Sequence, residues 1–176
     1  AQVMALSTGQ MAGLSTDNIA ALSAAQVGAI SPTQAAALST AQLAAIETAD
    51  LKSLSTAALR ALSAEQMAGL GSAQVAALSS TQVAALGSAQ LAGLNSADIV
   101  ALGSAQVAML SSTQVAALTA DQVAKLEATD LAALTPAALK GLSAEAMAGL
   151  TTAQVAALTS AQVAALSSAQ LAALTS

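Results

Sequence analysis

The residues best suited to chemistry in this chain are two pairs of carboxylates at the same spacing. Glu47 and Asp50 form the first pair, and Glu127 and Asp130 form the second. Calcium and magnesium prefer oxygen ligands, so each pair is a candidate cation site. The surrounding sequence lacks the alternating Asp or Asn ligands and the Gly of known calcium loops. Acidic side chains are also stabilised near a helix start, so we interpret both pairs as solvated surface and predict no metal-binding residues.

The composition removes most other kinds of chemistry. His and Cys are absent, which excludes disulfides, His or Cys metal ligands, and Ser-His or Cys-His catalysis. Aromatic residues are absent too, and four Lys and Arg stand against nine Asp and Glu. The chain therefore lacks both the stacking platforms and the basic surface that nucleic acids require. We predict a protein that is not an enzyme, with no catalytic residues, no cofactor-binding residues, no cofactor and no nucleic-acid partner.

The whole chain is built on one eight-residue phrase, close to Ser-Thr-Ala-Gln-Val-Ala-Ala-Leu. A branched aliphatic recurs at every eighth position from Leu6 to Leu174, which we term the Leu column. A second series, the Val column, runs from Val3 to Leu171, and Ala35 is its only small member. An uninterrupted short period is typical of repeat architectures in which each unit buries its apolar face against its neighbours. We predict a single domain over residues 1–176, which opens in mid-phrase and is expected to be part of a longer array.

Each octad carries the signals of a helix start. Ser7 is followed three residues later by Gln10, the pattern of a capping box. Pro32 and Pro136 follow a Ser or Thr, at the helical position that best tolerates proline. A continuous helix fits poorly, because eight residues turn it about 80° beyond two full turns and would spread both columns around its circumference. The fold class predicted is an all-α solenoid of very short capped helices, roughly five to seven residues each, stabilised by stacking.

Two longer patterns bear on the number of octads per coil. Gly71, Gly87 and Gly103 open every second octad in their stretch, whereas Ser or Asn opens the octads between them. The sequence around Glu47 also recurs around Glu127, which indicates an 80-residue super-repeat made of ten octads. Both patterns favour a 16-residue coil of two octads, with three octads per coil left open. Two octads per coil would give a rod on the order of 100 Å long.

Neither a membrane span nor a signal peptide is evident. The mean hydropathy is +0.70, but Ser, Thr or Gln interrupts nearly every octad. No stretch approaches the roughly 18 to 20 apolar residues that a membrane span requires. We therefore predict no membrane span.

The phrase Leu-Thr-Thr-Ala-Gln-Val-Ala-Ala-Leu at residues 150–158 and its relatives throughout the chain resemble a known class of repeat tract. Such tracts occur in very large bacterial secreted or cell-surface exoproteins that are described as adhesin-like. The resemblance covers the whole chain and implies an extracellular or cell-surface location and a stalk, spacer or matrix role. It implies no site residues.

These observations lead to one main functional prediction and two alternatives. The main prediction is a structural repeat module, either a rod-like spacer or a self-stacking filament segment, whose partners are flanking repeats or other copies bound end to end. One alternative is a scaffold that binds a protein or cations through acidic patches at residues 47–65 and 121–145. The other is an ice-binding solenoid that uses the Ser and Thr pairs. We interpret the recurring Gln as a helix cap rather than as a polar ladder for lateral assembly.

Overall fold

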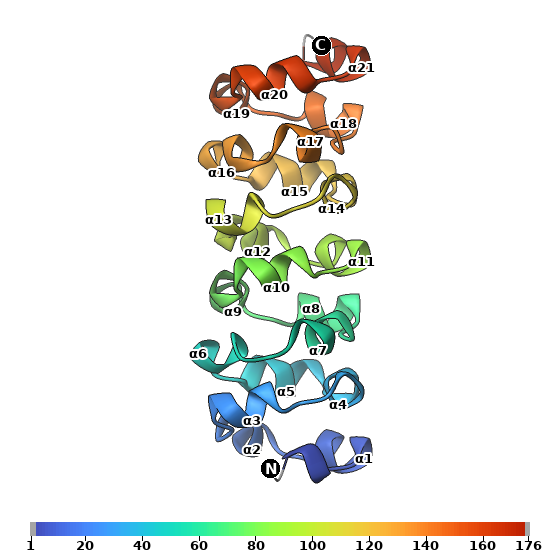
Figure 1. Cartoon of the computed structure of the whole chain (residues 1–176), viewed down its shortest axis with the longest axis vertical. Helices are drawn as coiled ribbons and strands as arrows, with labels where there is room; N and C mark the ends of the chain where they lie inside the picture. The colour runs from blue at the N-terminus through green and yellow to red at the C-terminus, as the bar shows by residue number, and fades with distance from the viewer. Residues whose placement is uncertain (1–2, 175–176) are drawn as a thin grey trace.

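The computed structural model describes residues 3–174, which form a straight stack of very short helices with the two chain ends at opposite ends of a rod (Figure 1). A 3₁₀ turn, η1 (Val3–Ala5), precedes 21 α-helices in this part of the chain, and one helix begins in each octad. In chain order the helices are α1 (Thr8–Ala12), α2 (Thr16–Ala20), α3 (Ala24–Gly28), α4 (Pro32–Ala37), α5 (Thr40–Ala45), α6 (Thr48–Leu51), α7 (Thr56–Arg60), α8 (Ala64–Ala68), α9 (Ser72–Ala77), α10 (Ser80–Ala84), α11 (Ser88–Ala92), α12 (Ser96–Ala101), α13 (Ser104–Val107), α14 (Ser112–Ala116), α15 (Ala120–Lys125), α16 (Ala128–Ala133), α17 (Pro136–Leu139), α18 (Ala144–Ala148), α19 (Thr152–Ala157), α20 (Ser160–Ala165) and α21 (Ser168–Ala173).

The predicted helix caps are confirmed. At the start of α5, the Ser39 hydroxyl accepts a hydrogen bond from the Gln42 backbone N–H at 3.1 Å. The Gln42 Oε1 atom in turn accepts from the Ser39 backbone N–H at 2.8 Å. Pro32 and Pro136 each occupy the first helical position, directly after their capping residues. Most helix starts are thus encoded within their own octads, whereas Glu47 and Glu127 make no side-chain cap at the starts of α6 and α16.

The coil contains three helices, so the prediction of two octads per coil is wrong. Each helix from α1 to α18 packs against the helix three places further along, beginning with α1 on α4, α2 on α5 and α3 on α6. One coil therefore consists of three octads. The helices α6 and α16, which carry the matching sequences that follow Glu47 and Glu127, belong to different stacks, because ten octads are not a whole number of coils.

The backbone between helices explains why three helices are needed. Leu38 ends α4 with a ψ of 140°, and Ser39 follows with φ and ψ of −73° and 162°. No residue from 3 to 174 has a positive φ, so these junctions lack the left-handed residue that commonly ends a helix in a sharp reversal. Two extended residues turn the chain only part of the way, and three such turns close the coil. Gly71, with φ and ψ of −77° and 151°, adopts the same conformation as Ser39. The alternation of Gly with Ser or Asn at this position therefore does not indicate a coil of two octads.

The rod is correspondingly shorter than predicted. Twenty-one helices taken in threes make seven coils in the part of the chain that the structure describes. At a spacing of about 9 Å between packed helices, seven coils span about 65 Å rather than about 100 Å. The stack that begins with α1, α4 and α7 moves from right to left in Figure 1 as it rises towards α13, so successive coils are rotated slightly about the rod axis.

Both predicted apolar columns form the core. Within the rod the Val column is fully buried, as at Leu59 and Val75, which are 0 % exposed. The Leu column lies beside it and is almost as well covered, as at Leu62 and Leu78. The small residue Ala35 is buried in line with the larger ones. A single narrow core therefore runs along the rod and connects every coil with the next.

Gly141 lies where two coils approach each other closely. A Cβ atom on Gly141 would collide with the backbone oxygen of Ser112 in the coil below. Gly149 occupies the same place one octad later, where a Cβ atom would meet nothing closer than 3.6 Å. We expect Gly141→Ala to lower the free energy of unfolding by about 2 kcal/mol, because the backbone of one coil must move. Gly149→Ala should leave it unchanged or raise it by about 0.5 kcal/mol. Denaturant unfolding of the two variants checks this, and equal effects would contradict the close approach.

Candidate functional site

The most regular polar feature of the rod is a Gln at the third position of most helices. In α9 the Gln74 Oε1 atom accepts a hydrogen bond from the Gly71 backbone N–H at 3.0 Å. The Gln74 Nε2 atom donates to the carbonyl oxygens of Leu43 at 3.1 Å and Ile46 at 2.8 Å, where α5 ends in the coil below. One amide thus caps the start of its own helix and the end of another.

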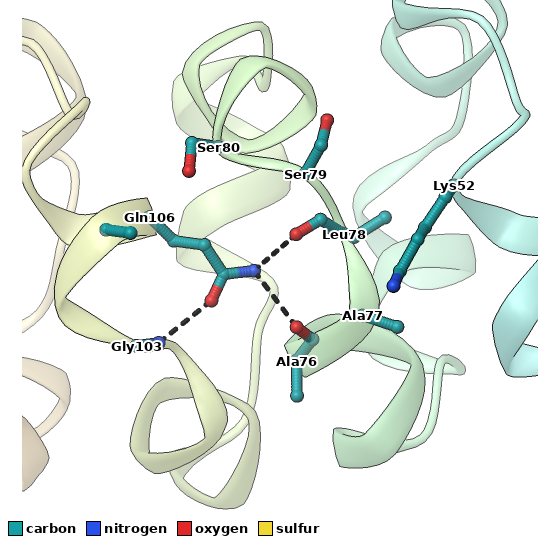
Figure 2. A pocket seen from close by; sticks show the side chains of 9 residues that line it. Lys52, Ala76, Ala77, Leu78, Ser79, Ser80, Gly103 and Gln106 are labelled. Atoms are coloured by element: carbon teal, nitrogen blue, oxygen red, sulfur yellow. Dashed lines mark hydrogen bonds between the residues drawn. The ribbon is translucent and has the colours of Figure 1, made fainter.

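Figure 2 shows the same arrangement at Gln106, whose Oε1 atom faces the Gly103 N–H and whose Nε2 atom lies against the Ala76 and Leu78 carbonyls. In every member of this series the amide donates to carbonyls where a helix of the coil below ends. We call the series the Gln ladder, and its members are Gln34, Gln42, Gln66, Gln74, Gln82, Gln90, Gln106, Gln114, Gln122, Gln154, Gln162 and Gln170.

The Gln ladder solves a problem that short helices create. The last carbonyls of every helix have no partner within that helix, and helices as short as these have many such groups for their length. The ladder amides supply donors to these carbonyls, and their side chains are buried, for example Gln162 at 1 % exposed. Each such bond contributes about 1 kcal/mol, whereas an unsatisfied buried carbonyl costs about 1–3 kcal/mol. The ladder therefore holds successive coils together.

The prediction that Gln acts as a helix cap is confirmed, but its second role was not predicted. A polar ladder exists, and it joins coils of one chain rather than neighbouring molecules. One sequence signal points to this role. A Ser or Thr hydroxyl alone can cap a helix, so a Gln recurring this regularly indicates a need for its Nε2 donor as well.

Asp98 and Asp130 replace Gln in the ladder and make different bonds. The carboxylate of Asp98, which is 0 % exposed, accepts from the Asn95 backbone N–H and from the Ser72 hydroxyl, both at 3.1 Å. The carboxylate of Asp130 accepts from the Ser104 hydroxyl. Both hydroxyls belong to the helix directly below the Asp that they contact. A carboxylate cannot donate, so these two octads bind the coil below through a serine instead of through carbonyls.

The two carboxylate pairs do not form matching open sites. Asp130 is buried, whereas Glu127 is exposed at the start of α16, so their side chains lie in different environments. Glu47 is exposed at the start of α6, and Asp50 is half-buried. Among residues 3–174, no group of three or more Asp and Glu side chains is placed to hold a metal ion. Cation binding through the acidic patches stays a prediction, as does ice binding through the Ser and Thr pairs.

A shallow surface groove of about 470 Å³ lies beside the Gln ladder (Figure 2). Lys52 lies on one side of it, and the Gln106 amide, already bonded to the coil below, lies on the other. The remaining lining residues are Ala76, Ala77, Leu78, Ser79, Ser80, Gly103 and Ala105. The groove thus offers one cationic group among small side chains and hydroxyls.

From residue 3 to residue 174, no helix has the length and apolar character needed to span a bilayer. No curated protein matches the chain. The ALTTAQ repeat family, however, matches six segments that together cover most of the sequence, namely residues 3–40, 43–80, 69–96, 91–127, 123–160 and 147–176. Residues 150–154, Leu-Thr-Thr-Ala-Gln, contain the residue types that end one helix, cap the next and supply a ladder amide. On the strength of these matches, the chain belongs to the ALTTAQ repeat family.

Proposed function

We propose that this chain is a rod-like spacer or stalk segment of a secreted bacterial surface protein. The observation that carries the proposal is the continuous core that connects every coil with the next, reinforced by the Gln ladder along most of the rod. A spacer must hold two points at a set distance. A stack in which every coil is bonded to the next resists bending better than helices joined by flexible linkers.

The repeat also makes length adjustable. Because each octad contacts only octads within about one coil, octads can be gained or lost without changing the contacts of distant coils. The cross-section then stays constant while the length follows the number of octads. This property suits a stalk whose task is to set a distance.

A solution measurement tests the spacer role. We expect small-angle X-ray scattering of the 176-residue chain to give a maximum dimension of about 65 Å plus the side chains at its ends. Duplicating residues 72–95, which make one coil, should add about 9 Å at constant cross-section. A control insertion of the same length, made of Gly and Ser at the same place, should instead give two rods joined by a flexible link. A maximum dimension unchanged by the duplicated coil would contradict the spacer role.

The extracellular location is proposed on the resemblance of the octads to repeat tracts of large bacterial exoproteins. It is tested on intact cells that produce the full-length protein, with an antibody raised against the array. Labelling of intact cells is the expected result. Labelling that appears only after the cells are permeabilised would contradict the proposal.

A further inference from the structure

The two ends of the rod present different surfaces. In the last coil, Val155, Val163 and Leu171 are 37 %, 41 % and 43 % exposed, although residues of the Val column inside the rod are fully buried. The Val column therefore emerges on the C-terminal face. It is covered elsewhere by the coil that follows, as at Val75 under α12 and its neighbours.

The N-terminal face is hollow. A depression of about 310 Å³ lies there, lined by Val3, Leu6, Leu14, Asn18, Leu22 and Gln26. The Leu column is only partly covered in this first coil, whereas Met11 and Ile19 of the Val column are already buried by the second coil. An apolar recess at one end thus matches three partly exposed aliphatic side chains at the other.

The hydrogen-bonding groups of the two faces also match. The Oε1 atoms of Gln10 and Gln26 cap the starts of their own helices. In the described part of the chain, the Nε2 atoms of these two residues donate to no other coil, unlike the amides of the Gln ladder. At the other end, no side-chain amide of residues 3–174 reaches the carbonyls of Val155 and Leu158, because the last ladder amide, Gln170, bonds further down the rod. The chain is a whole number of octads long, so a second copy continuing the same stack would place its Gln10 at the ladder position above these two carbonyls.

From this match we infer that the C-terminal face of one copy binds the N-terminal face of a second copy, head to tail, and reproduces between molecules the interface that joins coils within one. Octads continuing the array in the same chain would cover these faces in the same manner. Donors lie at one end and acceptors at the other, so two like ends cannot form these bonds. Such a contact does not close on itself and extends into a filament. The inference rests on the proposed rod only for its shape, and the spacer role stands without it.

The interface is one coil across and therefore small. We expect association only at concentrations on the order of 0.1–1 mM. Sedimentation equilibrium over this range should show the weight-average mass of the 176-residue chain rising with concentration. The upper end of this expected range is about 1 mM. A mass that stays at that of one chain up to this concentration would overturn the inference.

A matched pair of variants locates the contact. Val163→Asp places a charge on the C-terminal face, and Val100→Asp makes the same change at a side chain that is 46 % exposed in the middle of the rod. Both positions are exposed in a single chain, so both variants should retain the circular dichroism and thermal unfolding of the original chain. Val163→Asp is expected to abolish association, and Val100→Asp to leave it unchanged. Equal behaviour of the two variants would overturn the inference.

Mixing two defective chains tests the polarity. Replacing Gln10 and Gln26 together by Glu keeps the oxygen that caps each helix but removes the donor from the N-terminal face. This double variant and Val163→Asp should each be monomeric alone, and should form dimers but no longer species when mixed, since each retains one competent face. Self-association of the double variant alone would show that the contact does not need the Gln10 and Gln26 donors, and would overturn the proposed pairing of these donors with the carbonyls of the C-terminal face.

Discussion

Gln74→Glu is expected to lower the free energy of unfolding by about 4 kcal/mol. The new carboxylate can still accept from the Gly71 N–H, so the cap of α9 survives. It cannot donate to the Leu43 and Ile46 carbonyls, and it brings a negative charge close to both oxygens in a site that is only 5 % exposed. The loss of the inter-coil bonds and the buried charge therefore act together. Denaturant unfolding followed by circular dichroism measures the change.

Gln10→Glu is the matched control for this prediction. Gln10 caps the Ser7 N–H in the same way but donates to no coil in the described part of the chain, and its side chain is exposed. The substitution should change the free energy of unfolding by no more than about 0.5 kcal/mol. Similar losses at the two positions would mean that Gln serves only as a helix cap, and the role of the Gln ladder between coils would be wrong.

Leu59→Ala is expected to cost about 3 kcal/mol of unfolding free energy. Leu59 lies in the Val column and is 0 % exposed between the coils above and below it, so its removal leaves a cavity in the narrow core. Neighbouring coils are held apart by their backbones and can collapse into the space only in part.

The control for Leu59→Ala is Leu171→Ala, which makes the same change in the same column. Leu171 is 43 % exposed in the last coil, so its truncation removes little buried surface and leaves no enclosed cavity. Leu171→Ala is expected to lower the free energy of unfolding by less than about 1 kcal/mol. Thermal unfolding of dilute chains compares the two variants. A loss at Leu171 equal to that at Leu59 would contradict the core described above.

The local structure could be predicted from the sequence because it is specified within one octad. Ser7 and Gln10 form a capping box, and Pro32 begins a helix because it follows a capping Ser. The two columns define the buried face of each helix in the same local way. None of these features depends on which octads become neighbours.

The number of helices per coil could not be predicted, because every octad presents the same two apolar columns. Stacking two octads or three per coil buries the same residues, so the hydrophobic pattern does not distinguish them. The deciding quantity is the turn made by extended residues such as Leu38 and Ser39, and that turn follows from backbone angles rather than from residue type. The 80-residue super-repeat is divisible by sixteen, but this does not indicate how many octads form one coil.

The candidate site was predictable only in part. The sequence identifies the Gln positions as caps, but their donation to carbonyls of the coil below depends on the three-helix coil. The burial of Asp98 and Asp130 depends on it too, because each needs a Ser hydroxyl in the helix directly below. Asp50 has Ala24 at the corresponding position and is only half-buried. In both pairs the Asp lies 26 residues after the Ser that it contacts. This constant separation is the signal in the sequence for the burial of the Asp, but it can be interpreted only once the three-helix coil is known.

The most direct test of the three-helix coil is a pair of engineered cross-links in this cysteine-free chain. A Cβ atom on Gly28, at the end of α3, would lie 3.7 Å from the Cβ of Ser53 beyond α6. This separation falls within the range of about 3.5–4.5 Å seen in disulfides. In a two-helix coil, Ala45 would take the place of Ser53, one octad earlier. Under mild oxidation, Gly28→Cys with Ser53→Cys should form an intramolecular disulfide, and Gly28→Cys with Ala45→Cys should retain free thiols. Cross-linking of the second pair in place of the first, measured by mass spectrometry, would contradict the account.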